Sequence, residues 1–159
     1  MHVVNTHKRI INQPKADVVV LLETLSTKDD KVWPTTNWPA MRFRNGLKLG
    51  EKGGHGIIRY AVEDYISGEV IVFKFLKPKG FDGIHKFEIF EKEPNMMEIK
   101  HSIIMQTHGL VTLQWVFVIR WLHDALIENA FDTIENNFLE DKIFTKWTIW
   151  VRLWRFILK

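Results

Sequence analysis

The sequence contains no cysteine among its 159 residues. Disulfides, thiolate catalysis and cysteine-based zinc or iron–sulfur sites are therefore excluded, and the composition suits a reducing compartment. The first residues lack the apolar run of roughly 7–15 residues that a signal peptide needs. No uninterrupted apolar run approaches the roughly 18 residues of a membrane span. We therefore expect a cytoplasmic protein.

Acidic residues are missing from the last eighteen positions. The first 141 residues hold all 19 acidic and 17 of the 22 basic side chains, a net charge of −2, whereas residues 142–159 carry five basic side chains and a local charge of +5. A nucleic-acid-binding domain usually spreads its basic residues over one face of the fold. Because the excess here belongs to one tail, we expect no nucleic-acid partner.

The middle of the chain alternates between apolar and polar residues. After a predicted strand over residues 3–12 and a short helix over 16–25, turn residues separate five runs with a period of two. Residues 41–47 could add one short strand. Such runs with short connections predict a meander of antiparallel strands, at 56–64, 69–77, 83–92, 96–107 and 110–121.

From Leu122 onward the hydrophobic period becomes 3.6, which predicts a long helix. A single helix from there to Leu158 would be roughly 55 Å long, too long for a domain of this size. We therefore expect a break near residues 136–142.

The order of strand, short helix, antiparallel meander and long C-terminal helix resembles the helix-grip fold of the birch-pollen-allergen-like, START-related (SRPBCC) superfamily. The resemblance lies in Pro14…Leu22, in Gly54-His55-Gly56…Arg59-Tyr60, and in Trp115…Arg120 followed by His123-Asp124-Ala125-Leu126. It implies an α+β domain over residues 1–141, in which a curved antiparallel sheet of six to seven strands wraps around the long C-terminal helix. Residues 142–159 would form a separate basic extension.

The resemblance also implies a cavity between the sheet and the helix that holds a hydrophobic or aromatic small molecule. Members of the superfamily include lipid carriers, hormone receptors, polyketide cyclases or dehydrases, and chaperone co-activators. Function transfers poorly from fold alone. Small-molecule binding is therefore our first hypothesis, and a cyclase or dehydrase-like enzyme is the alternative.

His101 is the sharpest candidate residue, because it lies mid-strand between Ile99 and Ile103 on the face expected to point inward. In a cavity it could hydrogen-bond a ligand or act as an acid or base. The alternative is a structural histidine bonded to a neighbouring strand or a water. Other aromatic residues are candidate cavity linings or, alternatively, ordinary core or loop packing: Trp115, His85, Tyr60, Phe87, Phe73, Phe117, Trp33 and Trp38.

No catalytic motif is present. The chain lacks G-x-S-x-G and the P-loop spacing, so the glycine-rich residues 50–56 are expected to form a flexible hairpin at the cavity entrance. No H-x-x-x-H pair occurs, and we expect neither a metal nor a cofactor, although three histidines from separate strands could still meet. His123 and Asp124 are not expected to act as a dyad, because adjacent helical residues point about 100° apart. Asp124 is instead expected in the first turn of its helix.

The basic tail is strongly apolar, with eleven apolar residues among the sixteen of residues 143–158. As a helix it would place Trp147, Trp150, Val151, Trp154 and Leu158 on one face, opposite Arg152, Arg155 and Lys159. We expect this helix to pack on its own domain or against a second copy as a homodimer. Binding to a membrane surface is the less favoured alternative.

Overall fold

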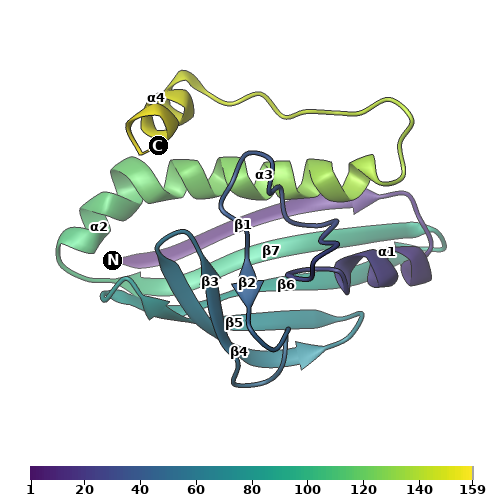
Figure 1. Ribbon diagram of the computed structural model, residues 1–159, viewed down its shortest axis with the longest axis horizontal. Helices are drawn as coiled ribbons and strands as arrows, with labels where there is room; N and C mark the ends of the chain where they lie inside the picture. The colour runs from purple at the N-terminus through teal and green to yellow at the C-terminus, as the bar shows by residue number, and fades with distance from the viewer. Residues whose placement is uncertain (159) are drawn as a thin grey trace.

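The computed structural model describes residues 1–158 and has an α+β architecture, with a curved sheet beneath one long helix (Figure 1). The strands are β1 (His2–Ile11), β2 (Arg42–Phe43), β3 (Lys52–His55), β4 (Ile58–Ile66), β5 (Val70–Lys77), β6 (Phe81–Glu93) and β7 (Met96–Thr107). The helices are α1 (Lys15–Leu22), α2 (Leu110–Gln114), η1 (Trp115–Ile119), α3 (Arg120–Asn136) and α4 (Ile149–Ile157).

The seven strands form one antiparallel sheet in the order β1-β7-β6-β5-β4-β3-β2. Strands β2 to β7 pair with their neighbours in sequence, and only β1 crosses over to join the last strand, with His7 opposite His101. Directly opposed residues share one face of a sheet, so this register places His7 on the same face as His101. The expected sheet of six to seven strands is confirmed.

The segments α2, η1 and α3 follow one another without a break and form a helix from Leu110 to Asn136 that lies across the sheet (Figure 1). The buried residues of α3 are Leu126, Ile127, Ala130, Phe131, Asp132 and Ile134. Most of these join the main hydrophobic core beneath the helix. The predicted break is confirmed, because α3 ends at Asn136.

The prediction of a strand over residues 110–121 is wrong, because this segment is helical. Its apolar residues are so numerous that they satisfy a period of two as well as a helical one. The residues that pack into the second core cluster, Val111, Trp115 and Ile119, recur every four positions, as on one face of a helix. Trp115 is 3% exposed, whereas Phe117, which was expected to share its face, is 56% exposed.

The glycine-rich residues 50–56 form part of a hairpin, as expected, and this hairpin belongs to the sheet. They contain β3, which pairs with both β2 and β4. A Cβ added at Gly53 would lie 2.3 Å from the Arg42 carbonyl oxygen, so only glycine permits this close approach of β2. The chain here belongs to the sheet.

The tail folds back over α3 and packs on its own domain. The Thr145 backbone amide donates to Asp132 Oδ2 at 2.6 Å, the Trp147 indole donates to Asn129 Oδ1 at 2.7 Å, and Val151 is 3% exposed. The helix α4 is shorter than expected, because residues 143–148 form no regular secondary structure. The expected position of Lys159 on its polar face lies outside the described residues.

Candidate functional site

A row of aromatic and imidazole rings crosses the face of the sheet that packs against α3. Tyr60 on β4 lies 4.6 Å from His85 on β6, measured between ring centroids, and His85 lies 5.6 Å from His101 on β7. The row continues to His123 on α3 at 5.0 Å and then to His7 on β1 at 5.9 Å. The sequence placed His85 and His101 on the inner face, and both are buried, at 5% and 1% exposure.

The buried imidazoles are neutral. Burial lowers the pKa values of His85 and His101 well below the ordinary value, and burial lowers the pKa of His55, which contacts Tyr60, to about 3. His101 Nε2 lies 3.4 Å from His85 Nδ1, while His101 Nδ1 and His85 Nε2 have no hydrogen-bond partner. A neutral imidazole offers one donor and one acceptor. These rings are therefore suited to hydrogen-bonding a polar group on a ligand.

The remaining predicted residues fall into separate environments. Phe73 stacks on His85 at 4.8 Å and Phe87 contacts His101 at 4.6 Å, so both belong to the row. Trp115 lies in the second cluster, with its ring 6.1 Å from His123. Phe117 does not line the interior, because the helical fold of residues 110–121 turns it outward.

The two bend tryptophans do not lie at one opening. Trp33 packs on His55 with 4.9 Å between ring centroids, and its indole donates to the Pro39 carbonyl oxygen at 2.9 Å. Trp38 lies beneath the tail, where its indole donates to Asn129 Oδ1 at 3.0 Å. The Arg155 guanidinium lies 4.5 Å above its ring. Trp33 therefore closes one end of the ring row, and Trp38 anchors the tail.

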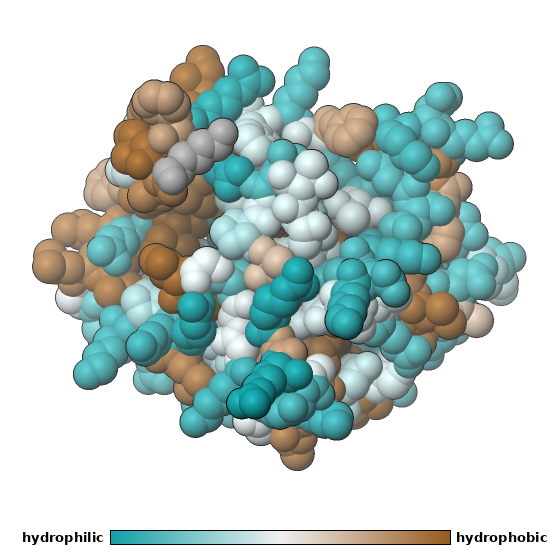
Figure 2. All heavy atoms as spheres, in the orientation of Figure 1, coloured by the Kyte–Doolittle hydropathy of each residue, from teal (hydrophilic) through white to brown (hydrophobic). Residues whose placement is uncertain are grey.

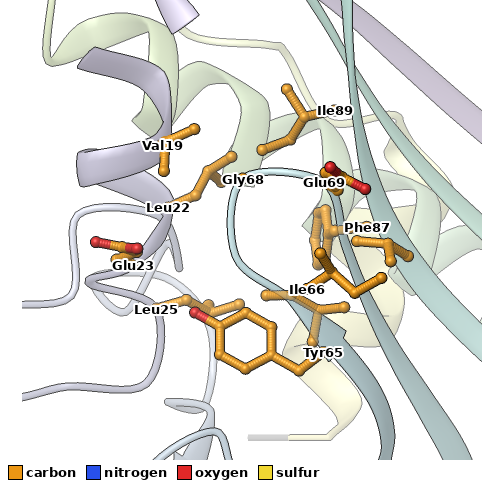
Figure 3. Close-up of a pocket in the computed structure, with 12 residues that line it drawn as sticks. Val19, Leu22, Glu23, Leu25, Tyr65, Ile66, Gly68, Glu69, Phe87 and Ile89 are labelled. Carbon is orange, nitrogen blue, oxygen red and sulfur yellow. The ribbon is translucent and has the colours of Figure 1, made fainter. Parts of the chain in front are cut away.

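A small apolar pocket opens between α1 and the middle of the sheet (Figure 3). Its volume of about 20 Å³ is enough for roughly one water molecule. The lining residues include Val19, Leu22, Tyr65, Ile71, Phe87 and Ile89. Phe87 therefore lines the pocket and also contacts His101, so this member of the ring row borders the pocket.

The mouth of this pocket is held by the turn between β4 and β5. The Ser67 hydroxyl donates to Glu23 Oε1 at 2.5 Å, which ties the turn to the end of α1. The same turn approaches the helix closely at Gly68, where an added Cβ would lie 3.1 Å from Val19 Cγ2. The Ser67–Glu23 hydrogen bond is exposed to solvent and lies outside the hydrophobic core.

A second set of residues, which sequence reasoning missed, joins β1 to α3. Asn5, His7 and Arg9 alternate along the inner face of β1 and face a row of acidic residues on α3. His7 Nδ1 lies 2.7 Å from Glu128 Oε1, and Arg9 Nη1 donates to Glu135 Oε2 at 2.7 Å. The signal in the sequence was the spacing of the helix acids every three or four residues: Asp124, Glu128, Asp132 and Glu135.

His123 and Asp124 also differ from expectation. Because the helix begins at Leu110, Asp124 lies in its interior and not in its first turn. Asp124 Oδ1 accepts a hydrogen bond from the Asn5 amide at 2.9 Å and lies 3.1 Å from His7 Nε2. His123 Nδ1 lies 3.5 Å from the same oxygen. His123 and Asp124, although adjacent on the helix, therefore both lie close to His7 on β1.

No family model and no curated protein matches the sequence. Solved structures do match its fold. A solution structure from Thermobifida fusca has a TM-score of 0.65 at 12% identity, over 90% of this chain and 99% of that one. Norcoclaurine synthase from Thalictrum flavum, in complex with dopamine and hydroxybenzaldehyde, has a TM-score of 0.66 at 10% identity, over 91% and 90% of the two chains. The chain therefore has the helix-grip, birch-pollen-allergen-like fold.

Proposed function

We propose that the protein binds a small, largely apolar aromatic molecule in the space between α1, the sheet and the ring row. The observation that carries the proposal is the apolar pocket of Figure 3, whose inner wall, Phe87, packs directly on the buried His101. A mostly apolar pocket with a few polar groups is the usual form of a small-molecule site. The aromatic ligands of the structurally similar norcoclaurine synthase support the same class of molecule.

Binding requires the pocket to widen. At about 20 Å³ it does not hold a drug-sized or metabolite-sized ring. Rotation of Phe87 would connect the pocket to His85 and His101, and release of the Ser67–Glu23 hydrogen bond would let the β4–β5 turn move from α1. A polar group on the ligand would then pair with the free His101 Nδ1 or His85 Nε2.

A binding role suits His101 better than an acid or base role. A general base works best with a pKa near the operating pH, and burial holds the pKa of His101 well below its ordinary value. The cyclase or dehydrase alternative is therefore the less supported of the two.

The test uses the fluorescent probe 1-anilinonaphthalene-8-sulfonate and two variants of α1. Leu22→Trp fills the pocket, whereas Val20→Trp makes the same change on the face that is 66% exposed. We expect Leu22→Trp to weaken binding by at least about tenfold and Val20→Trp to leave it unchanged. Amide NMR shifts should locate the probe at residues around Phe87. Shifts confined to α4, or equal affinity in both variants, would contradict the proposal.

The outer surface supports a second candidate, the docking of a membrane surface rich in anionic lipid. Apolar side chains are exposed along α4 and along the adjoining first part of the long helix: Leu110, Leu113, Val116, Phe117, Ile149, Leu153, Phe156 and Ile157. The Trp150 indole donates to the Phe117 carbonyl oxygen at 2.8 Å, which joins the two groups into one patch. Figure 2 shows hydrophobic atoms gathered over α4 and beside it.

Charge favours this candidate as well. No acidic residue follows Asp141, and Arg152 is exposed on α4. Apolar burial together with basic charge is what binds amphipathic helices to anionic membranes. By length and composition Leu110–Asn136 could also cross a membrane, a test that core helices of soluble proteins pass too. Here its inner face packs on the sheet.

Co-sedimentation with vesicles of phosphatidylserine and phosphatidylcholine tests the second candidate. Phe156→Asp changes a side chain that is 80% exposed on α4, and Ile57→Asp changes one that is 78% exposed in the turn between β3 and β4. We expect Phe156→Asp to reduce the bound fraction severalfold and Ile57→Asp to have no effect. Binding that is absent in the unchanged protein, or equally reduced by both variants, would exclude this role.

A further inference from the structure

The ends of three side chains converge where β1 passes beneath α3. One ring nitrogen of His7, one of His123 and a carboxylate oxygen of Asp124 all lie within 4.8 Å of one another. The three side chains are only partly exposed, at 14%, 13% and 28%. They lie outside the apolar pocket, so a role for them is independent of the ligand site proposed above.

The spacing of these atoms suits a metal ion. Ligand atoms at about 2.0–2.1 Å from a tetrahedral Zn²⁺ lie roughly 3.3 Å from one another. Asp124 Oδ1 lies 3.1 Å from His7 Nε2 and 3.5 Å from His123 Nδ1. The two distances bracket the tetrahedral value, so Asp124 lies at a suitable separation from both imidazoles, and the ligand nitrogens of the two imidazoles lie within 4.8 Å of each other.

The surrounding contacts are those that orient metal ligands. His7 Nδ1 lies 2.7 Å from Glu128 Oε1, which directs the other ring nitrogen toward Asp124. A carboxylate on the far nitrogen is the usual outer partner of a metal-bound histidine. The Asn5 amide donates to the same Asp124 Oδ1 at 2.9 Å and holds the carboxylate in place, and Arg120 Nε lies 3.7 Å from the second carboxylate oxygen, Oδ2.

His123 provides an independent observation. Both of its ring nitrogens are shielded from solvent and neither has a hydrogen-bond partner. Its contact with Asp124 at 3.5 Å is therefore not a hydrogen bond. Buried polar nitrogens normally have a partner, so an imidazole in this state beside a carboxylate and a second imidazole points to a ligand.

We propose that His7, His123 and Asp124 bind a divalent transition-metal ion, and that Zn²⁺ suits them best. Two imidazoles and one carboxylate are ligands that Zn²⁺ commonly takes, and three protein ligands leave a position open for a water or a small molecule. The sequence showed no metal spacing because the ligands come from distant elements, with His7 and Asp124 separated by 117 positions in the sequence.

The test measures binding of Zn²⁺ by calorimetry and of Co²⁺ by its visible spectrum, on the full-length protein after removal of metal with a chelator. We expect one ion per chain and intense Co²⁺ bands typical of tetrahedral nitrogen and oxygen ligands. His123→Gln and Asp124→Asn should each weaken binding at least about tenfold, and Glu128→Gln, which changes the outer partner of His7 and leaves the three ligands in place, by roughly 10–100-fold. His108→Gln changes an exposed histidine and should have no effect.

Circular dichroism checks that each variant is folded. If a variant of a metal ligand fails to fold, Glu128→Gln, which leaves all three ligands in place, still tests the site. Absence of stoichiometric binding in the unchanged protein would overturn the proposal. So would loss of binding in His101→Gln with retention in His7→Gln, because the ion would then belong to the His85–His101 pair. Loss of binding in His108→Gln would show a surface site and would overturn it too.

Discussion

At the scale of single residues, the interior is unusual for its neutral histidines. His55, His85 and His101 lie among Trp33, Tyr60, Phe73 and Phe87, where a charged imidazole would lose its hydration. On β1, by contrast, burial lowers the pKa of His7 but hydrogen bonds to Asp124 and Glu128 raise it, and the net shift is upward. One face of the sheet therefore holds His85 and His101, whose pKa values are lowered, and His7, whose pKa is raised.

The free energy of unfolding should fall as the pH drops below about 6.5. Burial lowers the pKa values of His55, His85 and His101 in the folded protein. Below that pH these histidines are therefore protonated in the unfolded chain and remain neutral in the folded one. Each such histidine lowers the free energy of unfolding by up to about 1.4 kcal/mol per pH unit, and for His55 this continues down to its pKa of about 3. His7 opposes the trend, because its raised pKa stabilises the protonated folded state.

Urea unfolding at several pH values between about 7.5 and 5 measures this slope. His101→Gln removes one of the buried imidazoles. In this variant the free energy of unfolding should therefore depend less steeply on pH, by an amount that corresponds to close to one proton. A slope that is flat in the unchanged protein, or the same in the variant, would show that the buried imidazoles accept protons in the folded state.

At the scale of elements, the long helix decides which aromatic residues face inward. In the strand predicted for residues 110–121, Trp115 and Phe117 share one face because side chains alternate with a period of two. In the structure Trp115–Ile119 is a π-helix within the long helix, where two positions correspond to roughly half a turn, so the two side chains point in nearly opposite directions. Trp115 then packs on Phe81, and Phe117 joins the exposed patch.

Replacement of Trp115 and of Phe117 by alanine distinguishes the predicted strand from the observed helix. Trp115→Ala should destabilise the protein by roughly 3–5 kcal/mol, because it empties a buried site. Phe117→Ala should change stability by no more than about 0.5 kcal/mol, as is usual for an exposed position. Thermal or urea unfolding measures both, and equal large losses would favour the strand.

At the scale of the whole molecule, the sheet and the long helix separate three regions. The apolar pocket lies beside α1, the convergence of His7, His123 and Asp124 lies between β1 and α3, and the exposed apolar patch lies over α2, η1 and α4. The tail belongs to the fold on its inner side, through Val151 and Trp147, and leaves Phe156 and Ile149 exposed. The basic side chains of Arg152 and Arg155 on α4 therefore lie on the same short helix as this apolar surface.

The sequence by itself determined the class of fold and the inner face of most strands. Local alternation records which side of a strand is buried, so it placed His85, His101, Phe73 and Phe87 correctly. The lack of acids after Asp141 likewise located the basic tail. Both signals depend on residues that are near one another in the chain.

Only the tertiary structure decided the helical state of residues 110–121 and the partners of His7. A segment that is apolar on every side fits a strand and a helix equally well, and packing of Trp115 against the sheet settles it. The contact of His7 with Asp124 spans 117 residues. It arises because β1 pairs with the last strand and α3 lies above both, a relation that no local period of the sequence contains.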